Sequence, residues 1–271
     1  MRVLVKVGFG LLLLAFILIG LSYTMLRAQG TSRPANIEGR NVASEKRSID
    51  KAIRSIDLNG PIDLTLRQGA VASLEVRGEQ RMLGNVDTTI ENGTLHIAIK
   101  GRLVLHHRVP LQVVLVLPEI ENLKFMGSGD STVNGFSGDR VDLQLHGSGS
   151  VKFNGRFRDV SAAVRGSGEM ELNGGSSSEK VQVEVVGSGE MTVVGAAKEF
   201  RVEQTGSGDL NAEHLTCERA NVELQGSGSA VILAKRSIDV TLRGSGDITV
   251  HGNPDERVVN RTGSGSVDFV Q

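Results

Sequence analysis

The sequence feature that most constrains this chain is the tripeptide Gly-Ser-Gly, which occurs eight times from Gly127 onward. Successive copies lie 18 to 21 residues apart, and each copy is followed by Asp, Glu or Ser. A constant period of this length is typical of repeat proteins in which each repeat forms one turn of a coil. We expect the motif glycines to form the structural turns, because glycine adopts positive φ without steric cost. They are Gly127, Gly129, Gly147, Gly149, Gly166, Gly168, Gly187, Gly189, Gly206, Gly208, Gly226, Gly228, Gly244, Gly246, Gly263 and Gly265.

A short alternation of apolar and polar residues follows each motif. In the second copy, for example, Val151 and Phe153 flank Lys152. A similar alternation precedes each motif, as in the segment 141–145 with its Val, Leu and Leu. A period of two indicates β-strands with one buried face. One repeat is therefore predicted to be a strand, a Gly-Ser-Gly turn, a second strand and a variable loop of roughly three to six residues.

Stacking of these repeats into a coil is the preferred interpretation. Two strands of about five residues cannot bury their apolar face alone, but stacked copies can. About 20 residues at ~3.3 Å each give a contour of ~65 Å, which is enough for one flattened or three-sided rung. Parallel crossovers are overwhelmingly right-handed. The expected fold is therefore all-β, a right-handed parallel β-helix with rungs of about 19–20 residues, preceded by an N-terminal hydrophobic helix.

The first 30 residues predict a targeting or membrane segment. Arg2 and Lys6 give a basic start, and no charged residue occurs over 7–26. This stretch fits either a transmembrane helix or a secretory signal peptide, and both alternatives remain open. Either one would carry the remainder across a membrane. Residues 31–48, rich in Gly, Ser, Pro, Asn and charges, are expected to be a flexible linker.

Residues 49–126 are predicted to form a less regular β region that starts and caps the coil. Within it, Asn92-Gly93 is a strong β-hairpin signal. The nearly unbroken apolar run 109–117 reads as a buried strand that Pro118 ends. Residues 127–271 would then contain the eight repeats of the β-helix itself.

Four stretches in this order resemble a known bacterial family. They are Ile62-Asp-Leu-Thr-Leu-Arg-Gln-Gly69, Asn92-Gly93-Thr94-Leu95, Val113 to Pro118, and Gly127-Ser-Gly-Asp130. Their order and spacing, over about residues 49–271, are similar to those of the family called putative auto-transporter adhesin, head GIN domain. The resemblance implies a β-helix-like fold in an exported or envelope-associated protein. A shared fold does not by itself establish a function.

The residue after each motif is the first candidate for binding chemistry. In a coil these side chains would stack at a spacing of about 4.8 Å. Glu169, Glu190 and Asp209 would then place three carboxylates in succession, and calcium takes oxygen ligands of this kind. Calcium-binding β-rolls, however, use a shorter repeat of about nine residues. These three residues are therefore candidate calcium ligands, and a solvated turn is the alternative that we prefer.

Other common sites do not fit the sequence. A nucleophilic serine needs one distinct position with a base and an oxyanion hole, whereas the motif serines are equivalent. A phosphate loop needs a lysine after its glycines, which is absent here. His96 could share a metal with only one of His106 and His107, because adjacent strand residues point to opposite faces. We expect no catalytic residue, no metal site and no cofactor.

The composition narrows the range of partners. The chain has 30 basic and 31 acidic residues, so no nucleic-acid footprint is visible. The single Cys217 excludes an internal disulfide. Sugar-processing clefts commonly need aromatic platforms and a carboxylate pair, yet the chain has no tryptophan and only one tyrosine, Tyr23.

The preferred function is a non-enzymatic, exported or envelope-anchored interaction module, an adhesin-like surface scaffold. The alternatives are a polysaccharide-acting β-helix enzyme and a calcium-binding repeat protein. The expected location is the bacterial cell envelope, either the periplasm or the extracytoplasmic face of the inner membrane. The expected partners are an envelope protein or a surface polymer, the membrane through residues 7–26 if these are not cleaved, and a second copy through the open C-terminal rung.

Three residues break the inward pattern of the repeats. Gln204 and Arg261 stand where other copies have Leu or Val before the motif, and Arg257 stands where they have Val or Ile. The two arginines fall in the last repeat, where an open end needs polar cover. Gln204 lies in the middle of the coil and needs a hydrogen-bond partner if it is buried.

Overall fold

The structure is a computed structural model that describes residues 41–49, 52–101 and 109–270. The expected N-terminal hydrophobic helix and the greater part of the expected linker lie outside these residues. Within them, no helix is long and apolar enough to cross a membrane.

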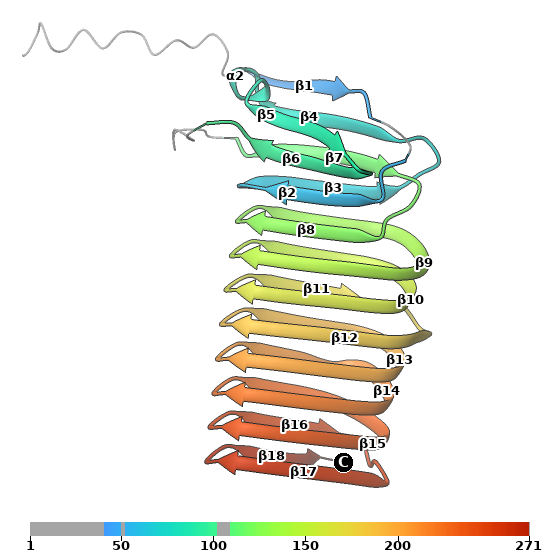
Figure 1. The fold of residues 1–271 in the computed structure, drawn as a ribbon, viewed down its shortest axis with the longest axis vertical. Coiled ribbons are helices and arrows are strands. Elements are labelled where there is room, and N and C mark those ends of the chain that lie inside the picture. Colours follow the sequence, from blue (N-terminus) through green and yellow to red (C-terminus); the bar gives the residue numbers. More distant parts are fainter. Residues whose placement is uncertain (1–40, 50–51, 102–108, 271) are drawn as a thin grey trace, which may run out of the picture. The chain divides into compact units, whose positions relative to one another are not determined.

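The described chain from Val42 onward is almost entirely β-structure with a single short helix among the described elements (Figure 1). In chain order the elements are β1 (Val42–Arg47), β2 (Ser55–Asn59), β3 (Ile62–Gln68), β4 (Ser73–Glu79), α2 (Gln80–Leu83), β5 (Val86–Glu91), β6 (Thr94–Ile99), β7 (Leu111–Leu117), β8 (Asn122–Gly127), β9 (Asp130–Gly147), β10 (Ser150–Gly166), β11 (Glu169–Asn173), β12 (Ser178–Gly187), β13 (Glu190–Gly206), β14 (Asp209–Gly226), β15 (Ser229–Gly244), β16 (Asp247–His251), β17 (Glu256–Gly263) and β18 (Ser266–Val270).

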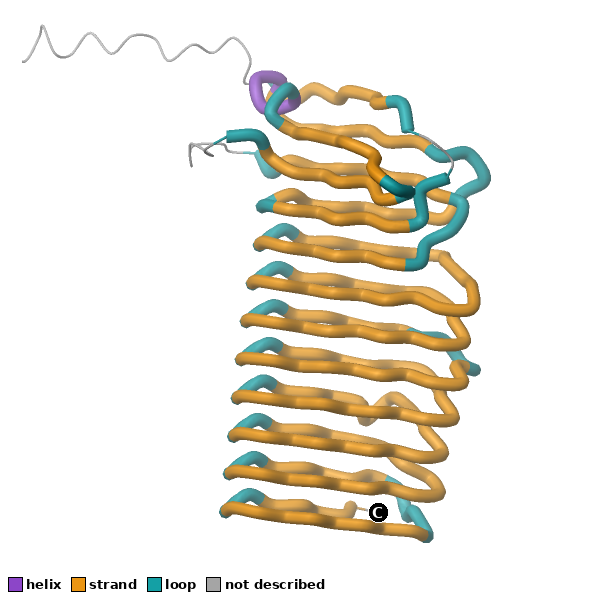
Figure 2. The backbone as a smooth tube through the Cα atoms, viewed as in Figure 1, coloured by secondary structure: helices purple, strands orange, loops and turns teal. Residues whose placement is uncertain are grey.

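Successive rungs pair in parallel with one another along both of their long sides. β9 and β10, for example, stay paired from Asp130↔Ser150 to Gly147↔Gly166. β13, β14 and β15 continue the same pattern. Figure 2 shows two long strand layers, joined on one side by the Gly-Ser-Gly corners and on the other by a bend. The predicted parallel β-solenoid with rungs of about 20 residues is therefore confirmed.

The alternating apolar residues fill the space between the two layers. Val141, Leu143 and Leu145 are each at most 1 % exposed, and the equivalent residues of the following rungs are also buried. Their polar neighbours face outward, because successive side chains of a strand point to opposite faces. Each fully buried large aliphatic side chain contributes about 1.5–3 kcal/mol of hydrophobic free energy. The rung repeats because every rung supplies the apolar surface that the next one needs.

The variable loop expected after the second strand of each repeat differs from what the structure shows. β9, β10, β13, β14 and β15 run through the bend as strand. The reason is that Phe136, Phe157 and Leu215 turn inward at the bend and are at most 4 % exposed, which keeps the backbone in the ladder. Differences in length are absorbed by register shifts, such as those between Asn154 and Gly155.

The region before the repeats combines coil rungs with a cap. β2 pairs in parallel with β6 and β8, and β3 pairs in parallel with β7 and β9. β4 is antiparallel to β1 and β7. β5 and β6 form an antiparallel hairpin around Asn92 (φ 50°) and Gly93 (φ 77°), as the Asn-Gly signal predicts.

Part of the segment expected to be a linker is a strand. β1 lies within 31–48 and pairs along its whole length with β4. It is held there by Arg47, whose guanidinium donates hydrogen bonds to the Val86 and Leu83 carbonyls and to Thr88 Oγ1. Ala43 also packs against the core. A short segment without a strong alternating pattern therefore becomes a strand through these tertiary contacts.

Candidate functional site

The Gly-Ser-Gly corners form a column in which each glycine has a separate reason to be glycine. The first glycine of each motif has φ between +113° and +143°. A Cβ at Gly206 would lie 2.3 Å from the Gly187 carbonyl oxygen, and one at Gly208 would lie 2.4 Å from the Gly189 oxygen. The backbones approach so closely because the ladder continues through the corner. The Ser207 amide, for example, donates to the Gly187 oxygen at 2.9 Å.

The side chains that follow the motif stack in register, and the aspartates are bonded to serines of the next rung. Ser150 Oγ donates to Asp130 Oδ1 at 2.9 Å. Ser229 Oγ donates to Asp209 Oδ1 at 2.6 Å, and the Ser229 amide donates to the same oxygen. Asp247 and Ser266 repeat this arrangement. The corner aspartates thus take part in rung-to-rung hydrogen bonding.

The candidate calcium ligands lie on neighbouring rungs. Glu169 is in register with Glu190, and Glu190 is in register with Asp209. Within the described residues, no group of three or more His, Cys, Asp or Glu side chains is arranged to hold a metal ion. His96 lies 3.7 Å from Asp57 Oδ2, whereas positions 106 and 107 lie outside the described residues.

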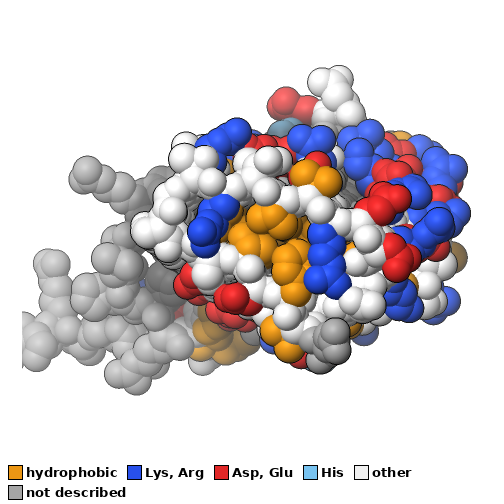
Figure 3. All heavy atoms as spheres, turned by 90° about the horizontal axis from the view of Figure 1, so that it is seen from below, with side chains coloured by type: hydrophobic (Ala, Val, Ile, Leu, Met, Phe, Trp, Pro, Cys, Tyr) orange, Lys and Arg blue, Asp and Glu red, His pale blue; other side chains and the backbone are white. Residues whose placement is uncertain are grey.

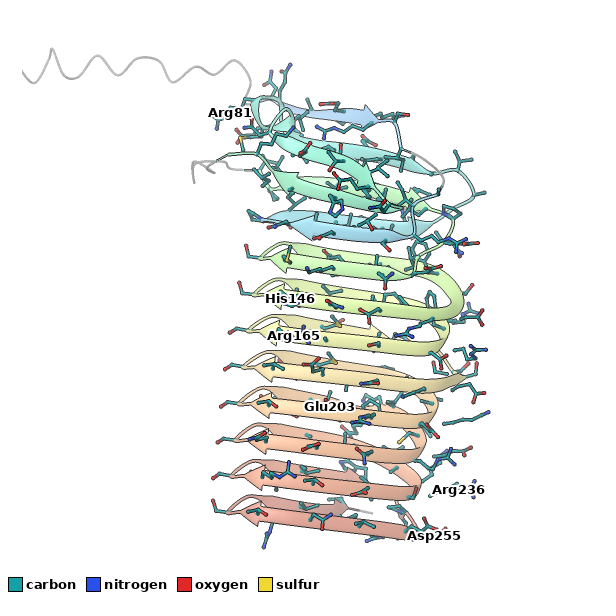
Figure 4. All side chains as sticks on the ribbon, viewed as in Figure 1. Arg81, His146, Arg165, Glu203, Arg236 and Asp255 are labelled. Atoms are coloured by element: carbon teal, nitrogen blue, oxygen red, sulfur yellow. The ribbon has the colours of Figure 1, made fainter. Side chains whose placement is uncertain are left out.

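The bend opposite the corners carries a pattern of charges that we call the charge ladder. Each rung contributes two adjacent residues of opposite sign, and the order of the signs reverses from one rung to the next. The pairs are Asp139–Arg140, Arg158–Asp159, Glu179–Lys180, Lys198–Glu199 and Glu218–Arg219. The first column of the ladder continues its alternation through Arg236 and Asp255, which Figure 4 labels on the bend side.

Because the signs reverse, in-register stacking places opposite charges against each other. Lys198 Nζ lies 2.6 Å from Glu179 Oε1, and Arg219 lies 2.8 Å from Glu199. The hydrogen bond from Lys198 to Glu179 raises the pKa of the Lys198 amine. Our sequence interpretation missed this ladder. The signal was the order of Asp-Arg, Arg-Asp, Glu-Lys, Lys-Glu and Glu-Arg at the same period as the glycines.

A long shallow trough runs beside the second column of the charge ladder. It consists of three concavities of about 490, 260 and 470 Å³. Arg140 lines the first and the second, and Lys180 lines the second and the third. The three concavities are therefore neighbours along the stack of rungs, and each shares a lining side chain with the next.

The walls of the trough are polar, and its floor is apolar. One wall is the ladder column that contains Arg140 and Lys180. The other wall carries mainly amides, hydroxyls and charges: Asn122, Ser161, Gln182, Arg201, Asn221 and Asp239. Val160 and Phe200 belong to the floor and are at most 3 % exposed. Neither Arg140 nor Lys180 has a hydrogen bond or an ion pair with another described residue.

Other charged residues of this strand layer form ion pairs. Arg165 pairs with Glu184 at 2.8 Å, Arg201 with Glu203 at 2.8 Å, and Arg243 with Glu223 at 2.5 Å. Figure 4 shows Arg165 and Glu203 on the front layer, where successive rungs present them on one surface. Such exposed pairs contribute little to stability. Beside the trough they leave a flat surface of low net charge.

Two polar side chains at inward positions, the buried Gln204 and the exposed Arg261, are explained by the corners. Gln204 is 1 % exposed, and its Nε2 donates to the Gly208 carbonyl and, at 3.2 Å, to the Ser229 carbonyl. Arg261, in the same inward column, donates to the Gly265 carbonyl at 3.0 Å. Each side chain therefore binds the second glycine of its own motif. The Gln204 Oε1 atom is buried without a partner.

Cys217 is the free thiol in the core of the described residues. It is fully buried, and its Sγ lies 3.2 Å from the Leu233 carbonyl oxygen. Burial raises the pKa of the Cys217 thiol to about 12. The thiolate needed for nucleophilic chemistry is therefore negligible at neutral pH.

Together these features define a class of protein: a parallel β-solenoid with glycine corners and an extended polar trough on one layer. The chain belongs to the family described as putative auto-transporter adhesin, head GIN domain, which matches residues 53–178 and 176–254. The description of this family points to a surface or exported protein. The family is not known for enzymatic activity.

Solved structures share the fold. A putative adhesin from Parabacteroides distasonis is 24 % identical, with a TM-score of 0.78 over 85 % of this chain and 97 % of its own. A putative adhesin from Parabacteroides merdae is 21 % identical, with a TM-score of 0.76 over the same shares of the two chains. A protein called a putative lipid binding protein, also from P. distasonis, is 21 % identical with a TM-score of 0.73, again over 85 % and 97 %. No curated protein matches this chain.

Proposed function

We propose that this protein is a non-enzymatic, adhesin-like interaction module whose trough binds an extended partner on the bacterial cell envelope. The observation that carries the proposal is the row of three neighbouring concavities that share Arg140 and Lys180 as lining residues. An enzyme cleft concentrates its chemistry at one point, whereas this surface repeats similar polar groups rung after rung. An extended polymer or the extended segment of an envelope protein suits such a surface.

The chemistry of the trough fits a polar ligand. Amides and hydroxyls on one wall donate and accept hydrogen bonds. Arg140 and Lys180 form no ion pair with a described residue, and Asp159 lies next to both of them in register. The trough thus offers both signs of charge beside amides and hydroxyls, which favours a polymer that carries hydroxyl and amide groups, such as a surface glycan or a peptide.

The test is binding of the purified full chain to isolated envelope fractions and to a panel of surface polysaccharides. Replacing Arg140 and Lys180 together by Ala is expected to weaken binding at least about tenfold, because two charged contacts are lost. Arg67→Ala is the matched control, because Arg67 is exposed, lacks a partner among the described residues and lies on the other strand layer. Equal binding by the double variant and the wild type would refute the role of the trough.

The alternative functions have their own readouts. Turnover on the same glycan panel, abolished by a single carboxylate substitution, would establish a polysaccharide-acting enzyme instead. Binding heat and a thermal shift with calcium, both lost when Glu190 is replaced by Gln, would establish a calcium-binding repeat protein. We expect neither result.

We further propose that the coil is right-handed. We also propose that residues 1–30 export the chain. They act either as a cleaved signal peptide or as a membrane anchor that leaves the solenoid on the extracytoplasmic face of the inner membrane. The basic start and the uncharged stretch 7–26 support export. Mass determination of the mature N-terminus, together with envelope fractionation, distinguishes the two forms. Recovery of the intact chain in the cytoplasm would contradict both.

A further inference from the structure

The last rung of the solenoid is paired on one side only. β17 pairs with β15, and β18 pairs with β16. On their other side, neither strand has a partner among the described residues. A free strand edge presents unpaired N–H and C=O groups that another strand can bind.

The hydrophobic core is also open at this rung. Val240 is 0 % exposed, whereas Val259, its partner in register on β17, is 42 % exposed. Val258 and Val270, at outward positions of the same rung, add apolar surface beside this opening and are 51 % and 43 % exposed. Figure 3, which views this end directly, shows apolar side chains at its centre with Lys and Arg side chains beside them. Such a surface would bury well against another rung of the same kind.

Arg257 and Arg261 occupy the two inward positions that flank Val259. In register they follow Ile238 and Leu242, which are both buried. Arg257 lies over the Phe269 ring, with its guanidinium carbon 4.5 Å from the ring centroid. It also donates to Asn253 Oδ1 at 2.7 Å and to the Pro254 carbonyl at 3.0 Å. With Arg261 bonded to the Gly265 carbonyl, both side chains are held by groups of their own rung.

The surface that complements this end is the same end of a second copy. At the opposite end of the described stack, β1 is antiparallel to its neighbour and carries Glu45, Lys46 and Arg47. That end therefore does not offer the parallel apolar rung that continues the coil. Two C-terminal rungs related by a two-fold axis can pair their β17 strands in an antiparallel arrangement.

The two arginines oppose this pairing. In an antiparallel pair centred on Val259, Arg257 of one copy lies opposite Arg261 of the second copy. Two such arginine pairs would be buried at the junction of two apolar cores without a carboxylate partner, which is strongly unfavourable. In contrast to the self-association expected from the sequence, we propose that Arg257 and Arg261 close the end of the core and prevent a second copy from joining it tail to tail.

The test is sedimentation velocity of the full chain in one fixed detergent over a wide concentration range. The variant carries Arg257→Ile and Arg261→Leu, which restore the residue types of the preceding rung. We expect the wild type to remain a single chain. The dimer dissociation constant of the variant should be at least about tenfold lower than that of the wild type. Amide hydrogen exchange should show new protection in β17 of the variant. Arg243→Leu, which removes a charge from the outward face, is the control and should leave both readouts unchanged.

Each result decides the proposal. A folded double variant that stays a single chain overturns it, and so does a wild-type dimer with protected β17 amides. A variant dimer without protection in β17 also overturns it, because the interface then lies elsewhere. If the double variant does not fold, Arg257→Gln with Arg261→Gln removes the charges while keeping hydrogen-bond donors. This second double variant must then show the same decrease in the dimer dissociation constant.

Discussion

At the scale of single residues, the corner glycines and Gln204 show how tightly the backbone of one rung lies on the next. Successive corners approach until no Cβ fits between a glycine and the carbonyl below it. From inside the core, the Gln204 amide donates a hydrogen bond to the corner carbonyl of Gly208. The identity of these residues is therefore set by the distance between rungs.

Replacing Gly206 by Ala is expected to lower the free energy of unfolding by at least about 2 kcal/mol. The cost combines the positive φ of 119° with the steric overlap at the Gly187 oxygen. Gly84→Ala is the control, because Gly84 has φ −65° and nothing lies within 4 Å of its Cβ position. Thermal unfolding followed by circular dichroism measures both. Equal melting temperatures for the two variants would contradict the argument.

Replacing Gln204 by Ala should cost about 3 kcal/mol, because a cavity forms and the Gly208 carbonyl loses its donor. Gln204→Leu should stay within about 1 kcal/mol of the wild type. It restores the volume and removes the unpartnered Oε1 atom while losing the same hydrogen bond. Gln225→Ala, at an exposed outward position, serves as the neutral reference. A leucine variant as unstable as the alanine variant would show that the hydrogen bond dominates.

At the scale of elements, the charge ladder supplies a code for which rung lies next to which. The hydrophobic columns are similar in every rung, so they alone distinguish one register from another poorly. The reversed sign order makes neighbouring rungs complementary and identical pairs repulsive. The individual ion pairs are exposed and weak, so the ladder acts on specificity more than on stability.

Exchanging the two charges of one rung tests this role without altering the composition. The double substitution Lys198→Glu with Glu199→Lys places like charges against Glu179 and Glu218 in one column and against Lys180 and Arg219 in the next. We expect a lower melting temperature at low ionic strength and recovery in high salt, where exposed charges are screened. A salt-independent difference would point to packing and not to charge.

At the scale of the whole solenoid, stability is the sum of the rungs and of the interfaces between neighbours. The described rungs differ little in their core, so the solenoid should tolerate the loss of a rung if the new neighbours match. The charge ladder predicts which deletions of rungs leave opposite charges on the new neighbours. Removal of one rung brings like signs together, whereas removal of two restores the alternation.

Deleting residues 188–206 places the Glu179–Lys180 pair next to Glu218–Arg219, which has the same order of signs. Deleting 188–226 places it next to Arg236–Ser237 and restores opposite charges in the first column. At low salt the longer deletion is expected to melt at the higher temperature, although it removes more core. High salt should reverse that order. A one-rung deletion that is more stable at every salt concentration would contradict the ladder.

Particular residues show how far the sequence predicts this structure. The glycine period and the alternation around Val151 and Phe153 determine the corners, the rungs and the core, because both are local consequences of backbone geometry. The strand β1 was not foreseen, because its pairing depends on anchoring by Arg47 to distant carbonyls. The trough beside Arg140 was not foreseen either. It arises from the way outward side chains of different rungs spread, which no local pattern contains.

The direction of the hydrogen bonds in the corner column and the two layers has a mechanical consequence. These bonds run along the stack, from one rung to the next, so a force applied between the two ends of the solenoid pulls directly along them. Rungs would then peel apart one after another at modest tension, each releasing a length of extended chain. A force applied across the rungs instead loads many bonds in shear at once. The trough follows the same axis, so a polymer bound in it as we propose would pull the solenoid lengthwise, in the direction in which the rungs separate one after another.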